Sequence, residues 1–337
     1  MDNKKISAIF YAVLAAIFYS LNMPASKILL KNIAPTMMAS LLYLGAGIGI
    51  GIIFLLAQNK TKDKTLLTKK DLPYTIGMVV LDIAAPILLM FGLVHTAAAN
   101  ASLLNNFEIV ATTIIALFIF KEAISKRLWI AIFLVTLSTI ILSVEDMSSL
   151  NFSWGSLLVI LATLCWGLEN NCTRMISSKN IYEIVTIKGL CSGLGSMVIA
   201  LTIGEIIPPL EYFVITLALG FVAYGLSMFF YIKAQNVIGA AKTSAYYAIA
   251  PFIGVLLSVV FLHEHITTNY LLALSIMIIG SALIVVDTLQ VNHEHRHYHL
   301  FTHTHNGSTH KHAFSHSHTH KHMGSENVHH HSHDFSL

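Results

Sequence analysis

Charged side chains are scarce in this chain. Only 11% of its 337 residues are Asp, Glu, Lys or Arg, whereas 55% are hydrophobic. Soluble domains carry about 25% charged residues, so the composition excludes an ordinary soluble domain. The small net charge of +3 gives no indication of a nucleic-acid partner.

Cysteine is equally sparse, and motifs for catalysis are missing. The three cysteines, Cys165, Cys172 and Cys191, are scattered through apolar segments. They offer neither a disulfide framework nor the paired spacing of a zinc site. The sequence also has no phosphate-binding loop and no recognisable pairing of a nucleophile with a base. We therefore expect that the protein is not an enzyme and that it requires no cofactor.

Long apolar runs follow one another almost without pause from Ile6 to Val286. A helix of about 20 such residues crosses a bilayer, and lipid offers no water to satisfy irregular backbone. The predicted fold class is an all-α integral membrane protein with ten transmembrane helices. We read the first as a retained helix, because no small-residue cleavage site follows it. The expected spans are 6–30, 35–57, 74–95, 97–120, 128–144, 153–175, 182–204, 212–235, 241–262 and 268–287.

A short sequence motif occurs twice, as KEAISKR at 121–127 and as HEHITTN at 263–269. The glutamates Glu122 and Glu264 lie 142 positions apart, but the basic residues of the first copy have no counterpart in the second. Cytoplasmic loops of membrane proteins are enriched in Lys and Arg. Five spans in each half would place the two copies on opposite sides of the membrane, which explains the loss of charge. We predict two inverted five-helix repeats, 1–147 and 148–289, an arrangement typical of secondary transporters.

The enrichment of Lys and Arg in cytoplasmic loops also predicts the orientation of the chain in the membrane. Basic residues gather in segments such as 58–73 (QNKTKDKTLLTKKDLP), whereas the loops on the other side carry Glu145, Glu205 and Glu211. We therefore expect a multi-pass protein of the cytoplasmic membrane with both termini in the cytoplasm.

Two stretches of the first half have counterparts in the second half. AIFYSLNMPASK (16–27) pairs with LCWGLENNCTR (164–174), and 96–122 pairs with 238–264. In their order and spacing, these stretches resemble the drug/metabolite transporter superfamily, in its ten-helix EamA-like branch. The resemblance implies a carrier that moves a small organic metabolite, such as an amino acid, nucleoside or drug-like solute, through a central cavity by alternating access. One departure is Leu42-Tyr43, which stands where the family often has an arginine.

Polar residues within the apolar spans are the candidate substrate-binding residues, because charge at this depth is costly and usually faces a cavity or a partner. Glu108 shares one helical arc with Asn105, and both it and Asp82 are candidates for proton coupling. Two pairings are alternatives to a substrate role: Asp82 with a lysine such as Lys233, and Glu169 with Arg174. The asparagines could equally form hydrogen bonds between helices, and the tyrosines could be packing residues. The full set is Asp82, Asn105, Asn106, Glu108, Trp166, Glu169, Asn170, Tyr246 and Tyr247.

The segment 290–337 has almost no apolar residues and many histidines, so it should be disordered. Neutral imidazoles bind Zn, Ni or Co, which makes the tail a candidate site for divalent metal ions. An alternative function is therefore transport of a divalent metal or metal complex, with the tail as buffer or sensor. The sequence indicates no oligomeric state. The candidate ligands are His293, His295, His297, His299, His303, His305, His310, His312, His316, His318, His320, His322, His329, His330, His331 and His333.

Overall fold

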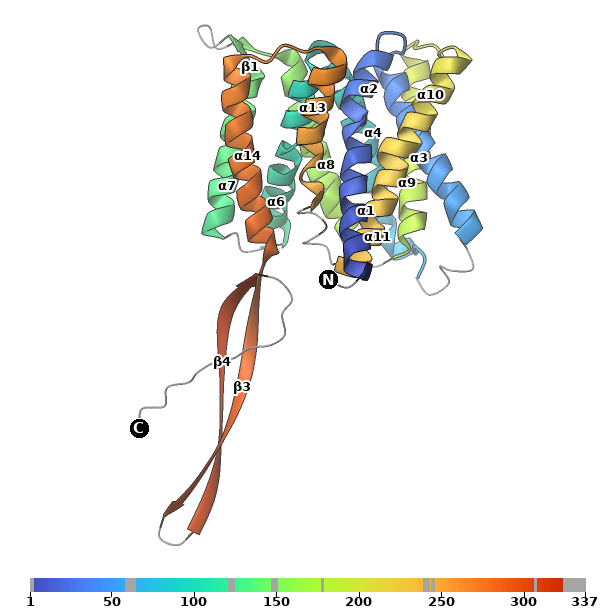
Figure 1. Ribbon diagram of the computed structural model, residues 1–337. Helices are drawn as coiled ribbons and strands as arrows, with labels where there is room; N and C mark the ends of the chain where they lie inside the picture. Colours follow the sequence, from blue (N-terminus) through green and yellow to red (C-terminus); the bar gives the residue numbers. More distant parts are fainter. Residues whose placement is uncertain are drawn as a thin grey trace. The chain divides into compact units, whose positions relative to one another are not determined.

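A computed structural model describes residues 3–57, 65–120, 125–146, 151–176, 179–238, 243, 246–305 and 308–323. The chain divides into two compact units, Met1–Val285 and Val286–Leu337. The first unit is a bundle of helices that run side by side (Figure 1).

The first half of the bundle consists of helices with one short 3₁₀ turn before α4. Their bounds are α1 Asn3–Ser20, α2 Asn22–Leu29, α3 Pro35–Ala57, η2 Lys69–Asp71, α4 Leu72–His95, α5 Ala98–Leu104, α6 Phe107–Phe120 and α7 Lys126–Ser143. Two short paired strands, β1 Val144–Asp146 and β2 Asn151–Phe152, join it to the second half. The second half comprises α8 Trp154–Ile176, α9 Ile181–Thr202, α10 Leu210–Gly220, the π-helical turn η3 Phe221–Leu226, α11 Ser227–Ile238, α13 Ala250–Leu262 and α14 Thr268–Leu289.

These helices begin and end within a few residues of most of the predicted spans. Eight of the described helical segments are long and apolar enough to cross a membrane. The predicted span 153–175 corresponds to α8, whose C-terminal half carries Glu169, Asn170 and Asn171. The predicted span 241–262 is described from residue 246, and α13 is its shorter apolar helix of 13 residues.

Several predicted spans are not single continuous α-helices. The first is interrupted at Leu21, between α1 and α2, and the eighth contains the π-helical turn η3. The fourth breaks at Asn105 and Asn106, between α5 and α6. The ninth has a turn at 248–249, so Pro251 lies in the first turn of α13, where proline costs no hydrogen bond. Pro86, in contrast, leaves α4 continuous. Broken helices expose backbone groups at membrane depth and are tolerated where they are enclosed by protein.

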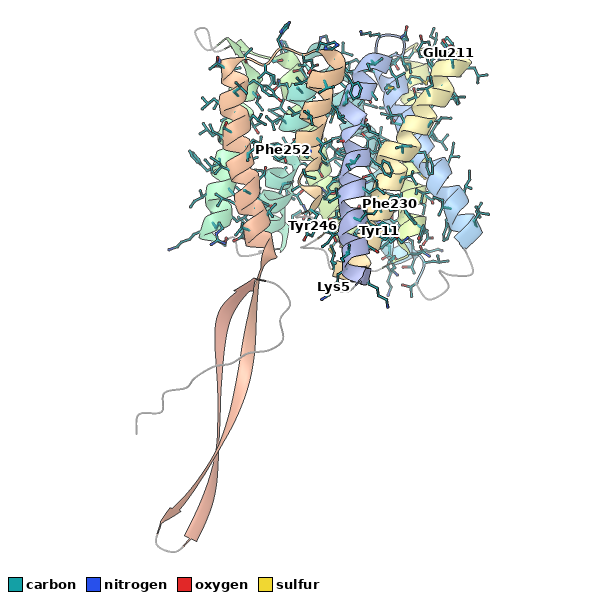
Figure 2. The ribbon with its side chains drawn as sticks, viewed as in Figure 1. Lys5, Tyr11, Glu211, Phe230, Tyr246 and Phe252 are labelled. Carbon is teal, nitrogen blue, oxygen red and sulfur yellow. The ribbon has the colours of Figure 1, made fainter. Side chains whose placement is uncertain are left out.

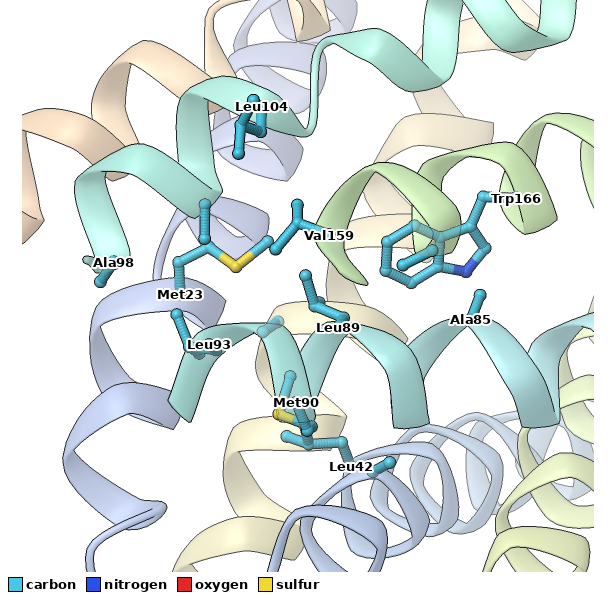
Figure 3. Packing of buried hydrophobic residues seen from close by; sticks show 14 of the residues in the cluster. Met23, Leu42, Ala85, Leu89, Met90, Leu93, Ala98, Leu104, Val159 and Trp166 are labelled. Atoms are coloured by element: carbon cyan, nitrogen blue, oxygen red, sulfur yellow. The ribbon is translucent and has the colours of Figure 1, made fainter. Parts of the chain in front are cut away.

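The interior combines large apolar side chains with close backbone contacts. Met23, Leu89, Leu93 and Trp166 interdigitate between the helices (Figure 3). Where α3 crosses α9, Gly47 packs so tightly that a Cβ atom there would lie 2.5 Å from a backbone nitrogen of the other helix. Small residues allow this approach, and the resulting van der Waals contact stabilises helix pairs in lipid.

Two glutamates of the second half cap helices of the first half. The Glu264 carboxylate accepts hydrogen bonds from the backbone nitrogens of Ala98 (2.7 Å) and Ala99 (2.8 Å), at the start of α5. The Glu205 carboxylate likewise accepts hydrogen bonds from the backbone nitrogens of Thr36 (3.2 Å) and Met37 (2.6 Å), in the first turn of α3. A carboxylate at a helix N-terminus satisfies free N–H groups and complements the helix dipole. Glu211 lies near the same end of the bundle as these caps, whereas Lys5 lies at the opposite end (Figure 2).

The second unit corrects one prediction. In place of the expected disorder, β3 Gln290–His305 pairs antiparallel with β4 Ser308–Met323. Alternation of histidine with other residues matches the two-residue period of a strand, and the two strands pair along an antiparallel ladder. Four predicted metal ligands, His329, His330, His331 and His333, lie outside the described residues.

The hairpin register puts histidines opposite histidines. The directly opposed pairs are His293 with His320, His295 with His318, His297 with His316, and His303 with His310. Opposed residues share one face of a two-stranded ribbon, and so do residues two apart on a strand. The other histidines of the two strands fall in the same phase: His299, His305, His312 and His322.

Candidate functional site: a buried ion cluster and an open carboxylate

A lysine within α9 joins two carboxylates from neighbouring helices. Lys188 Nζ lies 3.1 Å from Asp82 Oδ2 of α4 and 3.0 Å from Glu169 Oε1 of α8. The two carboxylate side chains are 0% and 1% exposed. Removing such charges from water costs several kcal/mol per ion, which only close pairing can offset. We call Lys188, Asp82 and Glu169 the ion cluster.

Hydroxyl and indole groups complete the ion cluster. The Tyr43 hydroxyl on α3 donates to Asp82 Oδ1 at 3.0 Å and accepts from Trp166 Nε1 at 3.3 Å. Thr173, one turn along α8, donates its hydroxyl proton to Glu169. Four helices therefore meet at one polar centre, and each group is held by at least one neighbour.

Glu108 lies nearby but in a different environment. It follows the helix break directly, in the first turn of α6, and accepts a hydrogen bond from Asn170 Nδ2 at 2.8 Å. The same amide donates to the Thr112 hydroxyl at 3.2 Å. In contrast to the ion cluster, Glu108 is partly exposed, and within the described part of the chain it forms no ion pair.

The helix break itself carries unsatisfied polar atoms. Asn105 Nδ2 donates to the Tyr19 hydroxyl at 2.9 Å, but Asn105 Oδ1 has no hydrogen-bond partner. Asn106 is 2% exposed, and neither of its side-chain polar atoms has a partner. Buried polar groups are normally satisfied, so these atoms could accept and donate hydrogen bonds to a bound molecule.

Tyrosine rings link the ion cluster to the helix break. The Tyr224 ring lies 5.3 Å from that of Tyr43 and 5.9 Å from that of Tyr19. Tyr19 in turn contacts Tyr247 at 5.9 Å, and the Tyr247 hydroxyl lies 3.3 Å from Ser227 Oγ. Asn22 Nδ2 holds the Tyr224 hydroxyl at 2.9 Å. Such centroid distances are those of favourable aromatic pairs.

Most of the sequence-predicted residues thus converge. Asp82, Glu169 and Trp166 belong to the ion cluster or its hydrogen bonds, and Glu108 with Asn170 forms the adjacent pair. Tyr246 differs: it is 39% exposed and lies at the level of Tyr11 (Figure 2).

A basic partner for Asp82 was expected and is present, but the lysine is not Lys233. Asp82 pairs with Lys188, whereas Lys233 Nζ lies 4.4 Å above the Tyr11 ring. Glu169 also pairs with Lys188, and the Arg174 side chain lies outside the described residues. The available signal was a single lysine in the apolar stretch IYEIVTIKGL (181–190), because an isolated charge at this depth requires a partner.

Metal ligands do not gather in the bundle. Among the residues whose side chains the structure describes, no three His, Cys, Asp or Glu residues form a group that could hold a metal ion. Within that part of the chain, the ion cluster is held together by its own lysine.

A helical bundle with apolar spans and a polar centre reached from several helices defines a multi-pass membrane protein. The EamA-like transporter family matches residues 6–144 and again residues 153–286. The chain therefore belongs to the EamA-like transporter family, as the resemblance predicted.

Two relatives agree with this assignment, and a solved structure shares the fold. An "Uncharacterized transporter" of Methanothermobacter thermautotrophicus is 26% identical over 272 residues, covering 75% of this chain and 78% of the relative. "Uncharacterized transporter YyaM" of Bacillus subtilis is 22% identical over 204 residues, or 58% of this chain and 67% of the relative. One solved crystal structure is similar in fold, with a TM-score of 0.62, 14% identity and coverage of 84% of this chain and 97% of that chain.

Proposed function

We propose that this transporter moves a small organic solute across the cytoplasmic membrane by alternating access. The observation that carries the proposal is the contrast between the sealed ion cluster and Glu108. A partly exposed carboxylate beside unsatisfied amides, next to a break in a helix, is suited to binding a polar solute. The ion cluster holds the helices around this position in register.

We further propose ten membrane spans arranged as two inverted repeats, 1–147 and 148–289. Gly47 and Gly189 pack against each other and lie 142 positions apart (189 − 47 = 142), the offset that separates Glu122 from Glu264. Equivalent residues meet only at a two-fold axis, so this contact supports the symmetry. The packing is matched as well: α4 packs on α8 as α1 packs on α11, and α6 packs on α8 as α13 packs on α1.

Proton coupling is part of the proposal. Glu108 is partly exposed and has no cationic partner within the described part of the chain, so it can exchange a proton during transport. Asp82, held by Lys188 and Tyr43, would exchange a proton only if the ion cluster opened. Glu108→Gln should therefore abolish pH-dependent uptake while leaving the ion cluster intact.

The test is solute counterflow in proteoliposomes containing the full-length protein. Vesicles preloaded with mixed unlabelled amino acids, nucleosides or organic amines are diluted into one labelled solute at a time. We expect at least one class to accumulate, and we expect Glu108→Gln to reduce the rate. Glu211→Gln is the matched control, because Glu211 is an exposed carboxylate at the start of α10. Counterflow of no solute in any class would contradict a carrier function.

For the tail, 290–337, we propose binding of Zn, Ni or Co, as a buffer or sensor that accompanies transport. The hairpin register supports this, because it gathers histidine positions from both strands on one face. Imidazole suits these ions, and tetrahedral zinc takes four ligands.

Register provides a sharp test of the tail. Inserting one alanine after Phe314 shifts His316, His318 and His320 to the opposite face, whereas inserting two restores the face. All three full-length proteins keep the same number of histidines. Zinc competition with a chromophoric chelator should give weaker binding for the single insertion than for the other two. Equal binding by all three would mean that only the number of histidines matters.

The proposed orientation, with both termini in the cytoplasm, is tested at two ends of the bundle. Lys5→Cys and Glu211→Cys introduce thiols at opposite ends (Figure 2). In intact cells, a membrane-impermeant maleimide should label the cysteine at 211 and spare the one at 5. The reverse pattern would invert the topology.

A further inference from the structure

We infer that the transported solute carries an ammonium group and that Glu108 binds it. This inference rests on the proposed transport function and narrows it to a chemical class, an organic amine or other organic cation. Four observations support it: the balance of charge, the accessibility of the carboxylates, the tyrosine rings at the helix break and the pairing of Lys188.

Among the residues whose side chains the structure describes, the charges at the centre of the bundle do not balance. Asp82 and Glu169 both contact one lysine, Lys188, while a third carboxylate, Glu108, is hydrogen-bonded to Asn170, the residue after Glu169. The lysine is already shared between Asp82 and Glu169, at 3.1 and 3.0 Å. Among the described side chains, Glu108 accepts its hydrogen bond from the neutral amide of Asn170. An ionised carboxylate away from water is stabilised by an opposite charge, and a solute cation would supply it.

Accessibility selects Glu108 among the three. The Asp82 and Glu169 side chains are 0% and 1% exposed, so a solute cannot reach them without opening the ion cluster. Glu108 is partly exposed, and so are its neighbours Thr112 and Asn170. A ligand can therefore contact the carboxylate while the ion cluster stays closed.

A cluster of tyrosine rings adjoins the helix break that directly precedes Glu108. It consists of Tyr19, Tyr224 and Tyr247. Their rings contact one another at 5.9 Å through Tyr19, and Asn105 fixes the Tyr19 hydroxyl three residues before Glu108. Tyrosine faces attract ammonium groups through the ring quadrupole, and a carboxylate adds direct charge attraction. A neutral or anionic solute gains neither.

Lys188 shows that carboxylates of this bundle hold an ammonium group. Its Nζ lies between the Asp82 and Glu169 carboxylates, and the Tyr43 hydroxyl donates to Asp82. An anionic solute would meet Glu108 while the nearby lysine is fully engaged with Asp82 and Glu169. Within the described part of the chain, Lys233 is held over the Tyr11 ring, on the part of α1 that lies two turns from Tyr19.

The test compares three ligands that share one carbon framework and differ in charge. Binding of 2-phenylethylamine, 2-phenylethanol and phenylacetate to the full-length protein in nanodiscs is measured by calorimetry. These molecules share an aromatic ring and a short chain and carry positive, zero and negative charge. We expect the amine to bind at least about tenfold more tightly than the alcohol, as for a close charge pair, and the carboxylate to bind more weakly than either.

Variants assign the effect to Glu108. Glu108→Gln keeps shape and hydrogen bonding but removes the charge, so the preference for the amine over the alcohol should vanish. Glu211→Gln, at the exposed start of α10, should keep that preference. Equal binding of the three molecules by the unaltered protein, or an amine preference that survives Glu108→Gln, would overturn the inference.

Failure of the inference and failure of the proposed function are distinguishable. If counterflow reveals a neutral or anionic solute and the amine does not compete with it, transport stands and the cation inference is wrong. If no solute undergoes counterflow, both are wrong.

Discussion

Glu264 and Ala98 are joined across the two halves of the chain. One oxygen of the Glu264 carboxylate lies 2.7 Å from the Ala98 backbone nitrogen, and the other oxygen holds the next nitrogen along α5. The glutamate of the repeated motif HEHITTN therefore caps α5, the helix that ends at the break beside Glu108. A residue that the sequence marked only by repetition has a definite structural role.

Removing this cap should weaken the bundle. We expect Glu264→Ala to lower the free energy of unfolding by about 1 kcal/mol, the usual cost of losing a helix N-cap. Glu264→Gln should cost less, because its amide oxygen can still accept one of the two bonds. Asn269→Ala, at an exposed position in the first turn of α14, is the matched control. Thermal melting of the purified protein in detergent measures all three, and equal melting of the alanine variant and the control would contradict the cap.

Lys188 should be the most sensitive residue of the ion cluster. Lys188→Met leaves two buried carboxylates without their cationic partner, at a cost of about 3–5 kcal/mol. Adding Asp82→Asn and Glu169→Gln removes those unpaired charges, so the triple variant should regain much of the loss. Equilibrium unfolding in mixed detergent micelles gives the values. A triple variant no more stable than Lys188→Met would mean that the charges are not coupled as the distances indicate.

The Tyr43 hydroxyl should matter because it satisfies two buried groups. Tyr43→Phe leaves Asp82 Oδ1 without its donor and the Trp166 indole without its acceptor. We expect a loss of about 1–3 kcal/mol, the cost of leaving a buried polar group unsatisfied. Tyr246→Phe, at a 39% exposed ring, should change stability by less than about 0.5 kcal/mol. Similar melting temperatures for the two variants would contradict the hydrogen-bonded arrangement.

Gly47 should reject even a methyl group. A Cβ atom there would lie 2.5 Å from the Leu190 nitrogen and 2.7 Å from the Gly189 carbonyl carbon. Overpacking of this kind costs about 1–3 kcal/mol or more, because backbone cannot rotate away. Gly51→Ala, one turn further along α3, meets only a Thr186 methyl group at 3.3 Å and should be mild. The recovery of monodisperse protein by size exclusion compares the two, and an equal recovery would be evidence against the close crossing.

The sequence predicted most of the helices because apolar length is a strong signal of membrane spans. The breaks were harder. In the sequence, Asn105 and Asn106 belong to an apolar span, and the interruption at these two residues, between α5 and α6, depends on neighbouring helices that enclose the exposed backbone. The polar residues Asp82, Glu108 and Glu169 stood out for the same reason that the helices did, since charge is rare at this depth.

Pairings could not be predicted, because they depend on how each helix is rotated about its own axis. Lys188 lies on α9, and its two partners come from α4 and α8, more than 15 positions away in the sequence. Tyr246 and Tyr247 are adjacent and chemically identical, yet Tyr247 contacts the Tyr19 ring and Tyr246 is 39% exposed. The turn at 248–249 and the start of α13 at Ala250 decide which of them faces the interior.

The contact between Gly47 and Gly189 has a consequence for motion. Each glycine would place a Cβ atom within 2.5 Å of backbone atoms of the other helix, so α3 and α9 touch through bare main chain. At these two glycine positions, no side chain has to separate from its neighbours or change rotamer when one helix tilts over the other. If the two halves of the bundle move relative to each other during transport, α3 and α9 can slide at this crossing without a change of side-chain rotamer. This freedom depends on having glycine at both positions.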